Sequence, residues 1–137
     1  MTARLAALLL AAAPLAACGA SVPNDEAAGP RQIGVLTIEP QALATRLDAG
    51  EPIELIDLRP RANFAEGHLP DAINMPLNTF DPAALLPLEG RERILYCRGD
   101  RCSAIAAQRL AQYENKTVVH LKGGIKAWED AGLPIVR

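Results

Sequence analysis

The sequence predicts an α/β fold, a doubly wound parallel sheet of about five strands with helices on both faces. From Ile33 to Arg137, short β-branched and apolar runs alternate with segments of helical periodicity, a pattern typical of parallel strands joined by crossover helices. Half of the 137 residues are hydrophobic, so the chain can bury one modest core. The composition therefore indicates a single folded domain and excludes a disordered chain.

Five apolar runs are expected to form the sheet. The expected strands are 35–38, 53–58, 72–74, 94–96 and 117–121. The clearest of them, Ile94-Leu95-Tyr96, runs straight into Cys97. A cysteine is therefore expected where a buried strand gives way to a loop.

Helices are expected in the intervals between these runs. Pro40 suits the first turn of a helix that ends at Gly50, and a short helix over 61–66 stops at Gly67. Further helices are expected after Asp81-Pro82, along a face shared by Ala106, Leu110 and Tyr113, and after Gly123-Gly124, where the last helix carries Trp128 and ends near Gly132.

The first 32 residues differ from the rest in composition. Residues 1–17 have a charged start and then an apolar run too short to span a bilayer, as secretory signals do. Leu15-Ala16-Ala17-Cys18 resembles the bacterial lipobox, which implies acylation of Cys18 and cleavage before it. Ordinary cleavage without acylation is the alternative. Residues 18–32 would then form the lipidated cysteine and a flexible tether, and 33–137 the folded domain.

The signal segment also carries an expectation about location. Acyl chains on Cys18 would hold the protein on a membrane of the bacterial cell envelope, facing the periplasm. Gly19 stands where lipoproteins kept at the inner membrane often have Asp. That resemblance slightly favours the outer membrane.

Composition excludes several classes of partner and cofactor. With 16 acidic and 14 basic side chains the net charge is -2, and only 4% of residues are aromatic, so neither phosphate neutralisation nor base stacking is expected and no nucleic-acid partner is predicted. The sequence contains no Cys/His cluster spaced to bind a metal. We expect neither a metal nor an organic cofactor.

Cys97 is the candidate nucleophile, because ligands of open parallel sheets bind beyond the carboxyl ends of the strands. Backbone N–H groups of the following loop and the start of the next helix would stabilise a thiolate there. Arg98 and Arg101 should lower the pKa of Cys97, and Asp100 should partly oppose them. The candidate substrate-binding loop is Arg98, Gly99, Asp100, Arg101, Cys102 and Ser103.

Three motifs in order resemble the single-domain rhodaneses, which are sulfurtransferases. They are Ile56-Asp57-Leu58-Arg59 with Phe64-Ala65-Glu66-Gly67-His68-Leu69-Pro70-Asp71-Ala72-Ile73-Asn74-Met75-Pro76-Leu77, then Cys97 at a strand end, then Leu121-Lys122-Gly123-Gly124 with Trp128 and Gly132-Leu133-Pro134. The resemblance implies that Cys97 accepts a sulfane sulfur as a persulfide and passes it on. It also implies supporting roles for Asp57 and Arg59 in bracing the loops around the site.

The loop departs from the family's usual Cys-Arg-Ser-Gly-x-Arg-Ser. Gly99 comes one position early, Asp100 stands where the family glycine would be, and Cys102 replaces the usual Arg or Ser. Cys102 leaves three alternatives open: a disulfide with Cys97, a dithiol in which Cys102 attacks an oxidised or persulfidated Cys97, or a spectator thiol. A permanent disulfide would prevent Cys97 from acting as a nucleophile.

The expected function is sulfur transfer from a small donor such as thiosulfate to a thiol or cyanide-like acceptor. One alternative is a thiol redox protein that cycles a Cys97–Cys102 disulfide with a thiol reductase as partner. Another is a non-catalytic sulfur carrier or binding module on the same scaffold. A phosphatase is disfavoured, because a Cys-x5-Arg loop needs arginine where Ser103 stands.

Overall fold

The computed structural model describes residues 33–137. The predicted signal segment 1–17 and tether 18–32, with the candidate lipidation site Cys18, lie outside the described residues. The strands are β1 Val35–Ile38, β2 Ile53–Asp57, β3 Ile73–Asn74, β4 Glu92–Tyr96 and β5 Val118–Leu121. The helices are α1 Pro40–Asp48, α2 Arg61–Glu66, α3 Asp100–Glu114 and α4 Gly124–Asp130, with two 3-10 turns, η2 Leu77–Thr79 and η3 Pro82–Ala84.

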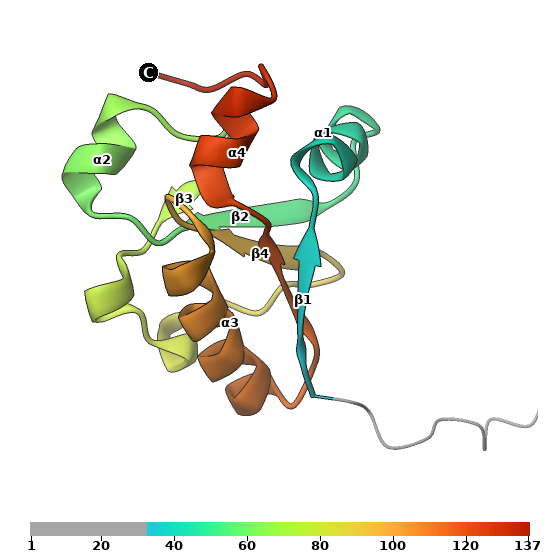
Figure 1. Cartoon of the computed structure of the whole chain (residues 1–137). Helices are drawn as coiled ribbons and strands as arrows, with labels where there is room; N and C mark the ends of the chain where they lie inside the picture. Colours follow the sequence, from blue (N-terminus) through green and yellow to red (C-terminus); the bar gives the residue numbers. More distant parts are fainter. Residues whose placement is uncertain (1–32) are drawn as a thin grey trace, which may run out of the picture.

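The five strands form one parallel sheet in the order β1-β5-β4-β2-β3. From β2 the chain moves outward to β3, whereas from β4 it moves in the opposite direction to β5, so the strand order reverses between β2 and β4 (Figure 1). Asp57 pairs with Tyr96 at the carboxyl ends of these two strands. The predicted fold class is confirmed, and this reversal is where doubly wound sheets bind ligands.

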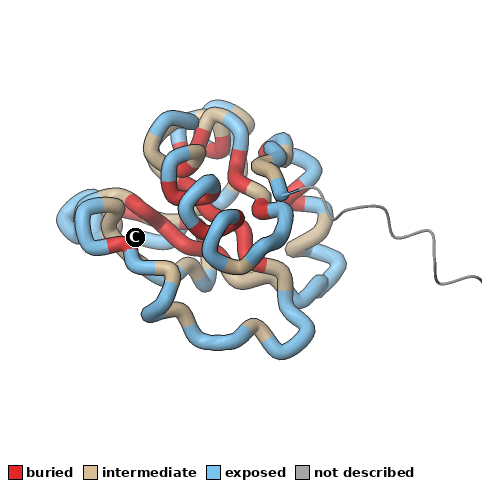
Figure 2. Tube along the Cα trace, turned by 90° about the horizontal axis from the view of Figure 1, so that it is seen from below, coloured by how far each residue is buried: buried red, intermediate tan, exposed pale blue. Residues whose placement is uncertain are grey.

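Helices cover both faces of the sheet, because alternate residues of each strand point to opposite sides. In β4, Ile94 and Tyr96 pack in one cluster with Trp128 of α4 and Leu43 of α1. Leu95 faces the other way and packs with the inner face of α3. Figure 2 shows the buried residues gathered in the interior of the domain, with exposed residues on its outer turns and loops. Trp128 is a core aromatic, 2% exposed.

One expectation about the face of α3 is wrong. Tyr113 was expected beside Ala106 and Leu110, but its side chain is 61% exposed. The sheet-facing line of the helix runs through Leu110 toward Glu114, whose carboxylate meets the buried Arg93 guanidinium. Tyr113 therefore lies at the margin of the buried face and projects into solvent.

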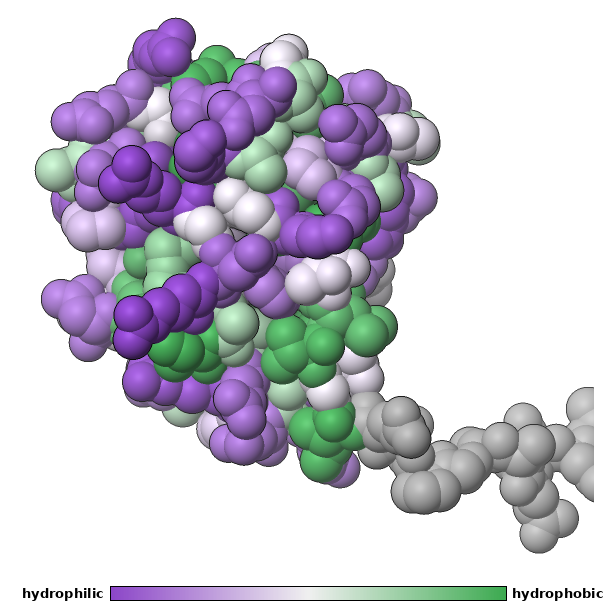
Figure 3. Space-filling model, in the orientation of Figure 1, coloured by the Kyte–Doolittle hydropathy of each residue, from purple (hydrophilic) through white to green (hydrophobic). Residues whose placement is uncertain are grey.

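The outer surface is mostly polar. Hydrophilic residues cover much of the face seen in Figure 3, with smaller hydrophobic areas between them. Among the described helices, none is long and apolar enough to cross a membrane.

Candidate active site

Cys97 is the first residue beyond β4 and is half-buried. The first turn of α4 holds its backbone: Ile125 N–H donates to the Cys97 carbonyl at 2.8 Å, and Lys126 N–H donates to the Arg98 carbonyl at 3.2 Å. The first turn of α4, far from β4 in the sequence, therefore fixes the start of the cysteine loop. The Cys97 and Arg98 carbonyls both point toward α4.

Gly124 allows α4 to approach this closely. A Cβ atom there would lie 2.4 Å from the Cys97 carbonyl oxygen and 2.6 Å from the Arg98 carbonyl carbon and oxygen, and φ is +60°. Gly123 contributes its N–H, which donates to Asp100 Oδ1 at 2.6 Å. Both glycines therefore act through their backbone, and Asp100 faces α4.

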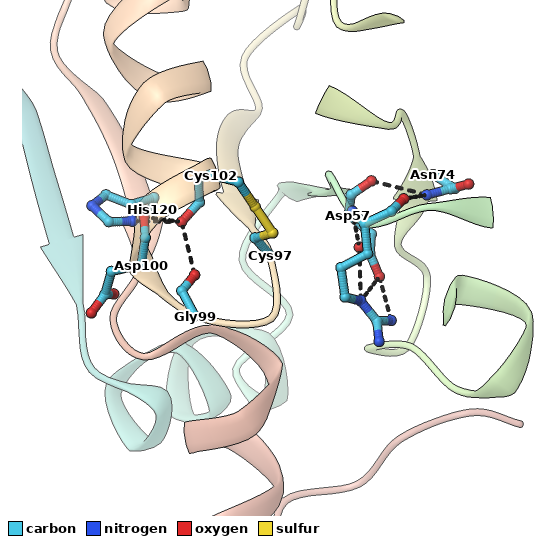
Figure 4. The surroundings of a disulfide bond; sticks show 9 residues. Asp57, Asn74, Cys97, Gly99, Asp100, Cys102 and His120 are labelled. Carbon is cyan, nitrogen blue, oxygen red and sulfur yellow. Dashed lines mark hydrogen bonds and ion pairs between the residues drawn. A yellow bond between two sulfur atoms is a disulfide. The ribbon is translucent and has the colours of Figure 1, made fainter. Parts of the chain in front are cut away.

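Cys102 lies in the first turn of α3 and is joined to Cys97 by a disulfide (Figure 4). Their Cα atoms are 6.1 Å apart. Gly99 is the N-cap of α3, and Arg98 and Arg101 are exposed on either side of it. In this state Cys97 cannot attack a donor, so any nucleophilic chemistry belongs to the reduced protein.

Ser103 and His120 lie behind the loop. Ser103 Oγ is 2.9 Å from His120 Nδ1 and donates to the Asp100 carbonyl at 3.1 Å. Both side chains are buried, Ser103 at 0% and His120 at 4% exposure. Burial lowers the pKa of His120, against a smaller opposing effect of the Asp100 carboxylate. A neutral histidine therefore ties the start of α3 to β5.

Asp57 and Arg59 lie at the end of β2, beside the loop. The fully buried Asp57 carboxylate accepts from Arg59 Nε at 3.0 Å and from Nη2 at 2.6 Å, and the same Nη2 donates to the Gly67 carbonyl at 2.6 Å. Asn74 donates to the carbonyls of both residues. The pair thus braces the segment after β2 and, in the described part of the chain, has no hydrogen bond to residues 97–103.

Tyr96, the last residue of β4, contacts the same buried pair. Its hydroxyl accepts the Leu69 N–H at 3.1 Å. Burial strongly raises its pKa, and the nearby Asp57 carboxylate raises it further. Tyr96 therefore stays neutral and acts as a structural link between β4 and the segment before β3.

A cleft of 530 Å³ opens at the reversal of strand order. Its walls are Leu58, Pro60, Pro76, Leu77, Asn78, Cys97, Cys102 and Arg109. The disulfide also borders a second hollow, which includes Arg98 and Arg101. Cys97 and Cys102 therefore line both hollows.

Arg109 is a site residue that the sequence reasoning missed. It follows Cys102 by seven positions, about two helical turns, and so lies on the same side of α3. Its guanidinium is exposed on the wall of the cleft, and no ion pair holds it within residues 33–137. The spacing to Cys102 was the signal that could have identified it. Together with Arg98 and Arg101 it makes the surroundings of the disulfide attractive to anions.

The described residues contain no group of three or more His, Cys, Asp or Glu side chains able to hold a metal ion.

Comparisons with known proteins agree with this arrangement. The sequence profile of the rhodanese-like domain matches residues 39–131. A sulfurtransferase of Allochromatium vinosum is 35% identical over 99 residues, which are 72% of this chain and 92% of that protein. An uncharacterized protein of Synechocystis sp. is 35% identical over 102 residues, 74% of this chain but only 56% of that longer protein.

A solved structure shares the fold. The solution structure of a rhodanese-like domain from an Anabaena sp. protein has a TM-score of 0.63 and 27% sequence identity, and the match covers 79% of each chain.

Proposed function

The chain belongs to the rhodanese-like domain family, and on that premise we propose that it is a sulfurtransferase that carries sulfur as a persulfide on reduced Cys97. The observation that carries the proposal is the position of Cys97. It lies at the end of β4, on the wall of a cleft at the reversal of strand order, directly before the amino-terminal turn of α3. The sulfurtransferase of Allochromatium vinosum, which the chain matches over nearly its full length, supports the same reaction class.

The donor we propose is an anionic sulfane such as thiosulfate. The Cys97 thiolate attacks the outer sulfur of thiosulfate, the sulfur–sulfur bond of the donor breaks, and sulfite leaves with the electron pair. A thiol or cyanide-like acceptor then attacks the outer sulfur of the persulfide and releases the Cys97 thiolate. Arg98, Arg101 and Arg109 balance the charge of the donor, and the N–H groups at the start of α3 balance that of the persulfide.

Reduction of the Cys97–Cys102 disulfide must precede this cycle. The proposed setting is the periplasmic side of the bacterial envelope, with the protein anchored to the outer membrane through acylated Cys18. Support for this setting comes from the sequence of residues 1–32 alone. A thiol reductase is the partner that the reduction requires.

A second candidate is a thiol redox protein that exchanges the disulfide with partner thiols. The bonded Cys97 and Cys102 favour it. The two candidates differ in their response to thiosulfate, because only the sulfurtransferase releases sulfite from it.

The test uses the reduced full chain, freed of reductant and mixed with thiosulfate. We expect sulfite release from the wild type and from Cys102→Ser, and a gain of one sulfur atom in the intact mass of Cys102→Ser. Cys97→Ser should do neither. If no variant releases sulfite while the disulfide still exchanges with a dithiol, the sulfurtransferase proposal is wrong and the redox candidate replaces it.

A further inference from the structure

We propose that Cys102 is an acceptor within the chain, whose thiol attacks the Cys97 persulfide, expels hydrosulfide and forms the Cys97–Cys102 disulfide. This inference rests on the sulfurtransferase function proposed above. It adds a product, hydrosulfide, and a class of partner, a dithiol reductant.

The disulfide shows which sulfur Cys102 can reach. Cys102 Sγ bonds Cys97 Sγ with the Cα atoms 6.1 Å apart, within the range of ordinary disulfides. In a persulfide, Cys97 Sγ is the inner sulfur and the sulfur taken from the donor is the outer one. Attack by Cys102 at the inner sulfur makes the outer sulfur the leaving group.

The atoms and electrons of this step balance. Cys97 first takes the outer sulfur of thiosulfate and releases sulfite. The sulfur of Cys102 then forms a bond to Cys97 Sγ, the inner–outer sulfur bond breaks, and the outer sulfur leaves with the electron pair as hydrosulfide, which carries the proton of the Cys102 thiol. The two thiols are oxidised to a disulfide, and the sulfane sulfur is reduced to sulfide.

Cys102 is well placed to act as a nucleophile. It is the third residue of the fifteen-residue helix α3, where free N–H groups and the helix dipole favour a thiolate. Exposed Arg101 is its neighbour. Ser103 also ties this turn to His120 and to the Asp100 carbonyl by hydrogen bonds that do not involve the disulfide.

A purely structural disulfide would stabilise the fold less here than one that closes a long loop. Only five positions separate the two cysteines, and closing so short a loop removes less chain entropy than closing a long one. The loop is already fixed to α4 through the Cys97 and Arg98 carbonyls and through the Asp100 carboxylate. The bond instead joins the proposed nucleophile to the nearest thiol at the mouth of the cleft.

The position of the disulfide beside two hollows should make its oxidation reversible. Both cysteines are half-buried and border the 530 Å³ cleft and the second hollow. An incoming thiolate therefore has a route to either sulfur. A dithiol partner is the appropriate reductant, because its second thiol resolves the mixed disulfide that the first one forms.

The experiment measures sulfite, hydrosulfide and intact mass after one exposure of the reduced, reductant-free full chain to thiosulfate without oxygen. The wild type should release one sulfite and one hydrosulfide per chain and then stop, with a mass two hydrogens below that of the reduced protein. Adding dithiothreitol, a small dithiol, should restart the release of sulfite and hydrosulfide. Cys102→Ser, and Cys102→Ala as a second variant, should release sulfite but no hydrosulfide and should retain one extra sulfur.

Two results would overturn the inference, and they are distinguishable. If the wild type retains the extra sulfur as stably as Cys102→Ser does, Cys102 is not the acceptor although the sulfurtransferase function stands. If neither the wild type nor Cys102→Ser releases sulfite, the proposed function itself fails and this inference fails with it.

Discussion

Ser103 Oγ lies 2.9 Å from His120 Nδ1, so a buried hydrogen bond joins the first turn of α3 to β5 directly behind the cysteine loop. The hydroxyl donates its proton to the Asp100 carbonyl and so accepts from His120 Nδ1. Because burial lowers the pKa of His120, the imidazole is neutral in the folded protein at neutral pH. Protonation would place an imidazolium charge in the core, so His120 should make the stability of the folded protein depend on pH.

Acidification should therefore destabilise the protein through His120. The pKa of His120 is lower in the folded chain than its ordinary value of 6.5, so the unfolded chain binds the proton first and stability falls as pH drops below that value. Chemical denaturation at about pH 7 and about pH 5 should show this loss. His120→Gln should flatten the dependence in this window, and His68→Gln should preserve it. An unchanged slope in His120→Gln would contradict the assignment.

Replacing Gly124 should disturb the cysteine loop. In Gly124→Ala the new Cβ would collide with the Cys97 and Arg98 carbonyls, so α4 or the loop must move. We expect a loss of roughly 2–4 kcal/mol in unfolding free energy and slower sulfite release from thiosulfate.

Gly132→Ala is the matched control for this substitution. Gly132 also has a positive φ, +70°, but a Cβ atom there would meet nothing within 4 Å. Gly132→Ala should lose only about 1 kcal/mol of unfolding free energy, from backbone strain, and its sulfite release should be unchanged. Equal losses in both variants would mean that the approach of α4 to the loop has no special importance.

Asp57 should be important for stability although it has no described hydrogen bond to residues 97–103. Its carboxylate is 0% exposed and pairs with Arg59, so Asp57→Asn leaves a guanidinium without its counter-charge. We expect a loss of about 3 kcal/mol in urea denaturation. The control is Asp130→Asn, which breaks the exposed pair with Lys126 and should change stability by less than about 0.5 kcal/mol.

The sequence predicted the sheet and its helices well because the signals were local. Apolar runs bounded by glycine and proline identified all five strands, and Pro40 correctly marked the start of α1. The expectation for Tyr113 was wrong because helical periodicity alone cannot locate the edge of a buried face. The sequence could not decide that Glu114, across from buried Arg93, continues that face.

The positions of the candidate site residues were predictable only where one segment supplied them. Cys97 and its loop follow β4 directly, and Asp57 ends β2 with Arg59 two positions later, so strand ends were enough to nominate them. The partnership of Ser103 with His120 joins α3 to β5 and depends on which strands lie side by side. The state of Cys102 was likewise open, because spacing permits a disulfide without requiring one.

Arg109 should help bring the anionic donor to the cleft. Its exposed guanidinium lies on the wall of the cleft that Cys102 also lines, and no described ion pair neutralises it. Arg109→Gln should slow sulfite release at low thiosulfate roughly three- to tenfold, and added salt should narrow the difference because it screens the attraction. Initial rates of the reduced protein at two ionic strengths measure both effects.

Lys116→Gln is the matched control for Arg109→Gln. Lys116 is also exposed but lies just beyond the end of α3, on a pocket with Arg91 and Glu92 at the start of β4, so its loss changes the net charge equally without changing the cleft. Its rate should match that of the wild type, and the stability of both variants should change little. If the two variants slowed the reaction alike, overall charge and not the position of Arg109 would govern the encounter. A rate loss in Arg109→Gln that salt does not reduce would mean that the guanidinium contributes by contact with the bound donor and not by long-range attraction.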